Sequence, residues 1–103
     1  MTHPRKSLDT VIHAPVRFSI AAALASVDEA DFQTLREAIE ITDSALSKQI
    51  ALLEQADYVK VRKGFVGKRS RTWLSLTGKG RTALTRHLEA LREIAAGELL
   101  EPP

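Results

Sequence analysis

Basic side chains gather in one stretch of this 103-residue sequence. Between Tyr58 and Leu88 there is no acidic residue, and there are nine basic ones: Lys60, Arg62, Lys63, Lys68, Arg69, Arg71, Lys79, Arg81 and Arg86. The net charge of +2 is therefore the sum of a strongly positive segment and a negatively charged remainder of the chain. Such a segment can displace counterions from a nucleic-acid backbone, or it can be an ordinary solvated face. The elements that carry it decide between the two.

A helix with an unusual polar face precedes the basic segment. We predict this helix from about Asp43 to Ala56, because Leu46, Ile50 and Leu53 recur at helical spacing. The opposite face carries small or polar side chains and no acid: Ser44, Ser47, Lys48, Ala51 and Gln55. A helix of this kind fits the major groove of B-DNA, where base edges present distinct donors and acceptors. We expect DNA contacts from its exposed side and from its N-cap: Thr42, Ser44, Ser47 and Lys48.

Residues 58–76 are typical of an antiparallel β-hairpin. The segments Tyr58–Arg62 and Arg71–Leu76 are rich in β-formers, and Gly64 and Gly67 bracket a turn between them. We expect further DNA contacts, to backbone or minor groove, from the basic side chains of this hairpin: Arg62, Lys63, Lys68, Arg69 and Arg71. The same charges could instead protect the hairpin edge from pairing, and both roles can hold together. We interpret Trp73 as a partly exposed packing residue.

The predicted elements form one mainly α domain with a small β-hairpin, an α+β arrangement. Residues 1–7 are expected to be flexible, and residues 8–26 to hold a helical turn followed by a helix that starts at Pro15. The complete order follows as N-terminal helices over 8–26, a helix-turn-helix over 31–56, a hairpin wing over 58–76 and a C-terminal helix over 77–97. Asp31 and Thr77 are the expected N-caps of two of these helices.

Apolar side chains near both ends of the chain predict a dimer. A C-terminal helix of about 20 residues extends about 30 Å, which is further than a domain of this size needs. Its distal half would expose an apolar stripe unless a partner covered it. We therefore predict that two groups of residues form a homodimer interface: Leu8, Val11 and Ile12 at one end, and Leu88, Leu91, Ile94 and Ala95 at the other. The alternative is that the second group closes the core of the monomer.

The chain resembles the small, single-domain winged helix-turn-helix transcriptional regulators related to the MarR and ArsR groups. The resemblance spans residues 8–95 and rests on several motifs: Phe32–Glu37, Ala45–Ile50, Leu53-Glu54, Leu76–Arg81, and an opening from Leu8-Asp9 to Val16-Arg17. It implies a homodimer on a pseudo-palindromic operator of double-stranded DNA. Asp57 stands where the family usually has glycine, and aspartate tolerates a left-handed backbone better than most residues.

Other functions find little support in the sequence. There is no cysteine, and His3, His13 and His87 lack metal-ligand spacing, so we expect no metal and no cofactor. No catalytic constellation is present, so we expect no enzyme. A small-molecule effector could bind near the dimer helices, but no converging polar residues mark a site. We expect neither a membrane-spanning helix nor a signal peptide, hence a cytoplasmic protein. The alternative function is a winged-helix module that binds another protein.

Overall fold

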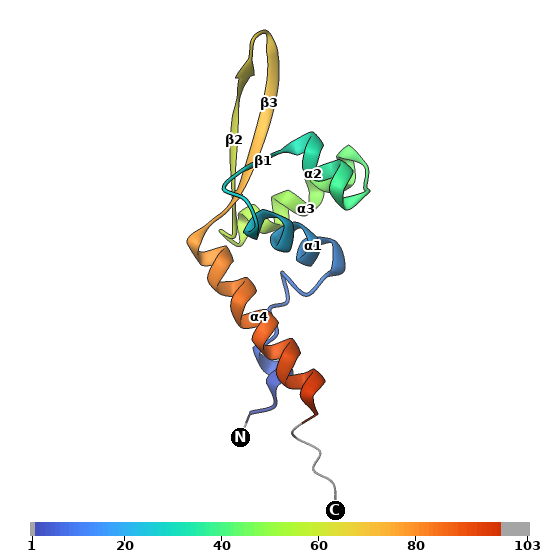
Figure 1. The fold of residues 1–103 in the computed structure, drawn as a ribbon, viewed down its shortest axis with the longest axis vertical. Helices are drawn as coiled ribbons and strands as arrows, with labels where there is room; N and C mark the ends of the chain where they lie inside the picture. Colours follow the sequence, from blue (N-terminus) through green and yellow to red (C-terminus); the bar gives the residue numbers. More distant parts are fainter. Residues whose placement is uncertain (1, 98–103) are drawn as a thin grey trace, which may run out of the picture.

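The computed structural model describes residues 2–97, which form an elongated molecule with the hairpin at one end and the last helix at the other (Figure 1). The elements in chain order are a 3₁₀ helix η1 (Pro4–Ser7), α1 (Pro15–Ala25), β1 (Ala30–Asp31), α2 (Phe32–Ile39), α3 (Asp43–Gln55), β2 (Val59–Val66), β3 (Arg69–Leu76) and α4 (Gly78–Ala96). The expected winged helix-turn-helix is confirmed.

Side-chain caps fix the starts of three helices, as the sequence predicted. The Asp31 carboxylate accepts the Thr34 N–H at 2.8 Å at the start of α2. The Thr42 hydroxyl accepts the Ala45 N–H at 3.1 Å at the start of α3. Thr77 does the same for α4, with the Gly80 N–H donating at 2.9 Å. Each cap satisfies a backbone donor that the first turn leaves without a partner.

Two acidic residues adopt the left-handed backbone conformation. Glu40 ends α2 with φ 60°, and Asp57 follows α3 with φ 64°. Glycine is favoured at such positions because a Cβ is sterically penalised there. The expectation that Asp57 could take the place of the usual glycine is therefore confirmed, whereas Glu40 was not singled out from the sequence.

The main core lies where α1, α2 and α3 pack against the lower half of the hairpin (Figure 1). Its buried members come from all five elements: Ile20, Leu24, Leu35, Leu46, Ile50, Leu53, Val59 and Leu74. The outer half of the hairpin extends beyond the helices, and its side chains from Arg69 to Arg71 are exposed. The core thus anchors the base of the hairpin and leaves the tip free to project.

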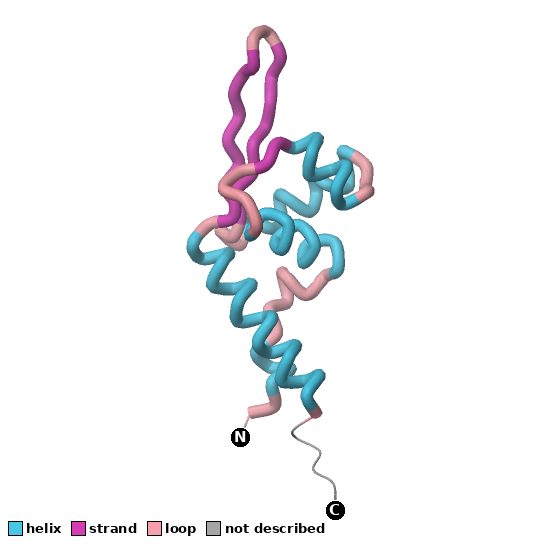
Figure 2. Tube along the Cα trace, in the orientation of Figure 1, coloured by secondary structure: helices cyan, strands magenta, loops and turns pink. Residues whose placement is uncertain are grey.

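The sheet is larger than the sequence indicated. Its three antiparallel strands have the order β1-β3-β2, and β1 pairs through Ala30 with Leu74 (Figure 2). The sequence does not predict β1, because a strand of two residues has no periodicity to detect. The pairing of β2 with β3 continues to Val66 opposite Arg69. The strands are therefore longer than the predicted segments 58–62 and 71–76, and the expected turn between Gly64 and Gly67 is displaced: Gly64 lies within β2, and the turn contains Gly67 and Lys68.

The N-terminal segment packs along α4. Pro4 is buried within η1, which lies against that helix. Residues 10–12 form the single helical turn that we expected: the His13 N–H donates to the Asp9 carbonyl at 2.8 Å, and the Asp9 carboxylate accepts the N–H groups of Val11 and Ile12. Ile12 is fully buried in its own chain. Val11 is partly buried against the main core. Ile12 therefore has no exposed surface to offer a partner, because its own chain covers it, whereas Val11 stays a predicted dimer contact.

Candidate DNA-binding surface

The polar face of α3 lies at the surface. Ser44, Ser47 and Lys48 are exposed, whereas Leu46 and Leu53 on the opposite face are fully buried. The division between buried and exposed faces is the one that helical spacing predicted. Thr42 is also exposed, but its hydroxyl is engaged in capping and lies 3.3 Å from the Ser44 hydroxyl. Hydroxyl and ammonium groups are therefore presented together by the first two turns of α3.

Two interactions hold α3 in place against its neighbours. Arg36 of α2 binds the Asp43 carboxylate in the first turn of α3, with 2.8 Å between Nε and Oδ1. Arg17 of α1 donates to the Gln49 side-chain oxygen at 2.9 Å. Neither arginine can be predicted as part of the site, because nothing in the local sequence shows that they meet α3. They position the helix rather than present free charge.

A groove separates α3 from the wing, the hairpin of β2 and β3. It consists of two neighbouring hollows, one of about 450 Å³ beside α2 and one of about 640 Å³ beside α3. The hollow beside α3 is lined by Ser47 and Ala51 from the helix and by Lys63 and Thr72 from the wing. Ser47 and Lys63, predicted separately, are thus brought to one groove. Glu54 lines it too, so the α3 side of the groove is not free of acid as the helical pattern suggested.

The wing carries most of the free positive charge of the surface. Four of its basic residues are exposed, and within residues 2–97 none of them forms a salt bridge: Lys63, Lys68, Arg69 and Arg71. Arg69 and Arg71 line the hollow beside α2 together with Arg36. Lys68 lies in the turn at the tip. The prediction that the hairpin presents a cluster of cations agrees with this placement.

Arg62 differs from the other predicted contacts. Its guanidinium binds the Glu29 carboxylate through two nitrogens, at 2.7 and 3.1 Å, and lies 4.1 Å from the centre of the Trp73 ring. The hydrogen bond with Glu29 raises the pKa of Arg62 and lowers that of Glu29. Trp73 packs on the wing as predicted. Arg62 is therefore a cation already neutralised by its own chain, which the sequence could not show because Glu29 lies 33 residues away.

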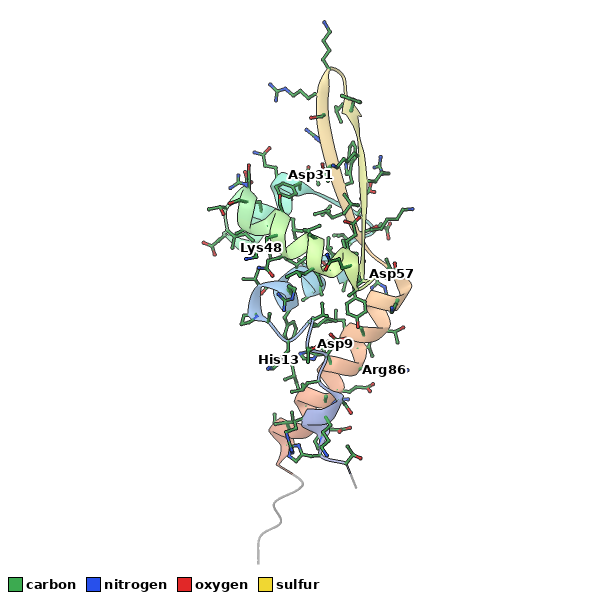
Figure 3. All side chains as sticks on the ribbon, turned by 180° about the vertical axis from the view of Figure 1, so that it is seen from behind. Asp9, His13, Asp31, Lys48, Asp57 and Arg86 are labelled. Carbon is green, nitrogen blue, oxygen red and sulfur yellow. The ribbon has the colours of Figure 1, made fainter. Side chains whose placement is uncertain are left out.

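A partly buried polar network connects the base of the wing with α4 and the N-terminal segment. The Tyr58 hydroxyl donates to the Asp9 carboxylate, which raises the pKa of Tyr58 to about 12. The Asp9 N–H donates to Nδ1 of His87 at 3.0 Å. His87 is fully buried between Phe18 and His13, and burial lowers its pKa. Figure 3 shows Asp9 and His13 between the helices, with Asp57 at the foot of the wing.

The distal part of α4 leaves apolar side chains uncovered. Leu84, His87 and Ala90 are buried against the chain, whereas Leu88 is 47% and Ile94 38% exposed. Of the other predicted interface residues on this helix, Leu91 is half-buried and Ala95 is exposed, and Leu8 near η1 is half-buried. The exposed face is compatible with the predicted interface.

Other kinds of site are not formed by the described residues. Within residues 2–97 no three histidine or acidic side chains come together as a metal site would require. None of the described helices is long and apolar enough to cross a membrane.

A helix-turn-helix with a hairpin wing, a polar recognition-type helix and a cationic wing tip defines the winged-helix class of domain. The family model for the winged helix DNA-binding domain matches residues 16–95. The chain belongs to this family.

Solved structures agree with this assignment. A transcriptional regulator homologue from Pyrococcus horikoshii is 26% identical, with 97% of this chain and 100% of that one covered and a TM-score of 0.85. NadR, solved in complex with 4-hydroxyphenylacetate, is 28% identical over 98% of this chain and 72% of its own, with a TM-score of 0.70. The MarR-family regulator Sco3205 from Streptomyces coelicolor, solved in complex with DNA, shares the fold at 24% identity and a TM-score of 0.66, covering 96% and 68%. The fold is that of MarR-like transcriptional regulators.

Proposed function

We propose that this chain is a homodimeric, sequence-specific DNA-binding transcriptional regulator. In this proposal α3 enters a major groove, and the wing lies on the flanking backbone or in the adjacent minor groove. The observation that carries it is the shared groove: Ser47 of α3 and Lys63 of the wing line one hollow, with further exposed cations along the hairpin. A DNA backbone lying in this groove would place base edges against α3 and phosphates against the wing.

The uncovered face of α4 supports the dimer. Exposed Leu88 and Ile94 lie about 120° apart around a helix of 19 residues, with the half-buried Leu91 between them, so they form the two edges of one apolar stripe. The helix leads away from the wing (Figure 1). Pairing two copies along this face would remove both side chains from water and leave both α3 surfaces free. Two-fold symmetry then predicts two half-sites about one helical turn apart, or a multiple of it.

The salt dependence of DNA binding tests the surface. The protein is first used to enrich duplexes from a random-sequence pool, and binding to an enriched duplex is then measured over a salt series. Replacing both Arg69 and Arg71 by alanine should make the negative slope of log K against log salt less steep by about 2, because each phosphate contact contributes about −0.9 to it. The charge-matched control replaces Arg86 and Arg92, which are exposed on α4, and should leave the slope unchanged.

Three results would contradict the proposal. An unchanged slope in the wing variant would remove the wing from the DNA surface. If the wild-type protein binds no duplex even at low salt, the winged helix acts as a protein-interaction module instead. Sedimentation tests the dimer separately: the Leu88→Glu, Ile94→Glu variant should be monomeric where the wild type is dimeric. A wild type that is already monomeric at micromolar concentration would refute α4 pairing.

A small-molecule effector is a second candidate feature of this function. A hollow of about 540 Å³ lies between the N-terminal segment and α4, lined by Leu8 and Tyr58, by the cations Lys79 and Arg86, and by Asp9. The Asp9 carboxylate already accepts the Tyr58 hydroxyl, and the two cations match an aromatic acid such as the one with which NadR was solved. Thermal shift with 4-hydroxyphenylacetate should raise Tm for the wild type and not for Arg86→Gln. No shift in either protein would refute this site for aromatic acids.

A further inference from the structure

The tip of the wing exposes apolar side chains among its cations. Phe65 is 74% exposed and Val66 is 50% exposed, which makes them the most exposed large apolar residues of the described chain. The cross-strand partner of Phe65 is Ser70, a small polar residue that provides no apolar cover. An aromatic ring in water at the far end of a hairpin contributes nothing to the core, and folding alone does not account for it.

The position of Phe65 in its strand shows which way it faces. Side chains alternate between the two faces of a strand, so Phe65 lies on the same face as Lys63 and Val61. Lys63 and Val61 line the hollow beside α3. Phe65 therefore extends the groove-facing side of the wing beyond the helices. Val66 lies on the opposite face, and Lys68 follows in the turn.

The spacing between Lys63 and Phe65 matches the dimensions of DNA. Two strand residues span roughly 6.6 Å, and the minor groove of B-DNA is about 7.5 Å deep. With Lys63 at a phosphate on the edge of this groove, the ring of Phe65 reaches towards the base pairs at its floor. The positive charge of Lys68 and Arg69 around the tip matches the negative potential of the groove.

We propose that Phe65 is an apolar wedge that enters the minor groove beside the α3 half-site and partly unstacks one base step, so that the bound DNA bends. The inference rests on the proposed DNA-binding function. Apolar side chains at the tips of DNA-binding elements kink a duplex in this way, and the deformation costs least at TA and CA/TG steps. Phe65 thereby adds a preference for a flexible step at a position that no polar side chain reads.

Base unstacking can be measured directly with the full chain. The probe is a duplex enriched by the wild-type protein, carrying 2-aminopurine at successive positions flanking the half-site and a dye at each end. Wild-type protein should raise the 2-aminopurine emission several-fold at one flanking step and shorten the distance between the dyes. Phe65→Ala should abolish both signals and weaken binding roughly tenfold, the size expected for losing one base–aromatic contact.

A neighbouring variant provides the control. Val66→Ala removes apolar surface from the other face of the same hairpin tip and should bend the duplex as the wild type does. If Phe65→Ala still bends and unstacks the duplex, the wedge is refuted while DNA binding stands. If Phe65→Ala instead changes the sedimentation of DNA-free protein, the ring covers a second copy and the wedge is again refuted. A wild type that binds no duplex refutes both proposals.

Discussion

Replacing Gly80 with alanine will force α4 away from the base of the wing. An added Cβ would lie 2.2 Å from the carbonyl oxygen of Tyr58 and 2.9 Å from Cδ1 of Leu76. The carbonyl cannot simply retreat, because it accepts the Thr77 N–H at 2.9 Å. Thr77 in turn caps the helix that contains Gly80. The added methyl group therefore displaces backbone rather than the end of a flexible side chain.

These contacts determine how much the free energy of unfolding should fall in the Gly80→Ala variant. Overpacking against backbone costs about 3 kcal/mol, the upper end of the usual range. Weakening the hydrogen bond from Thr77 to Tyr58 costs about 1 kcal/mol more. The better helix propensity of alanine offsets about 1 kcal/mol. We expect the free energy of unfolding to fall by about 3 kcal/mol, and Tm to fall by roughly 12–24 °C.

Urea denaturation followed by circular dichroism measures this change, and Gly78→Ala is the matched control. A Cβ at Gly78 would meet nothing within 4 Å, although the residue lies in the same turn of the same helix. Its free energy of unfolding should stay within about 0.5 kcal/mol of wild type. If the two variants are equally stable, the close approach of α4 to Tyr58 does not hold the wing base.

Three further predictions concern other positions. Glu40→Gly should raise the free energy of unfolding by about 1 kcal/mol in urea denaturation, because glycine relieves a left-handed backbone; an unchanged midpoint would contradict this. Stability should fall as the pH drops below about 6.5, since burial lowers the pKa of His87 and the unfolded chain takes up the proton first. His87→Gln should flatten this urea-midpoint profile, and a variant whose profile falls as steeply as that of the wild type would refute it. Arg62→Ala should change the salt slope of DNA binding less than Arg71→Ala, because Glu29 already pairs with Arg62; equal changes would count against that pairing.

Local signals made the helices predictable from the sequence. Asp31, Thr42 and Thr77 are polar residues directly before apolar periodicity, and all three cap as expected. The motif from Leu76 to Arg81 also gains a physical explanation. Its threonine caps α4, and its second glycine allows the helix to approach the Tyr58 carbonyl. Such features depend on a few neighbouring residues, so one sequence is enough to reveal them.

Features set by distant partners were not predictable in the same way. Ile12 has the spacing of an interface residue, but its own chain covers it completely. Arg62 has the composition of a DNA contact, but Glu29 binds it from another loop. The strand β1 consists of Ala30 and Asp31, too short for any alternation. In each case the sequence gives the chemistry of a side chain, whereas the fold determines which partner it meets.

The rigid junction between the wing base and α4 has a consequence for operator architecture. Gly80 lets α4 lie close against the Tyr58 carbonyl, and the hydrogen bonds through Asp9 to His87 connect the same tyrosine, directly before β2, to the helix. In a homodimer paired along α4, each wing would move with its helix as one body. Moving one α4 along the other by one helical turn would shift the two protomers relative to each other by about 5.4 Å. That shift corresponds to roughly one and a half base pairs of DNA, at about 3.4 Å each. The C-terminal helix would then determine the spacing between half-sites, while α3 determines the bases within each one.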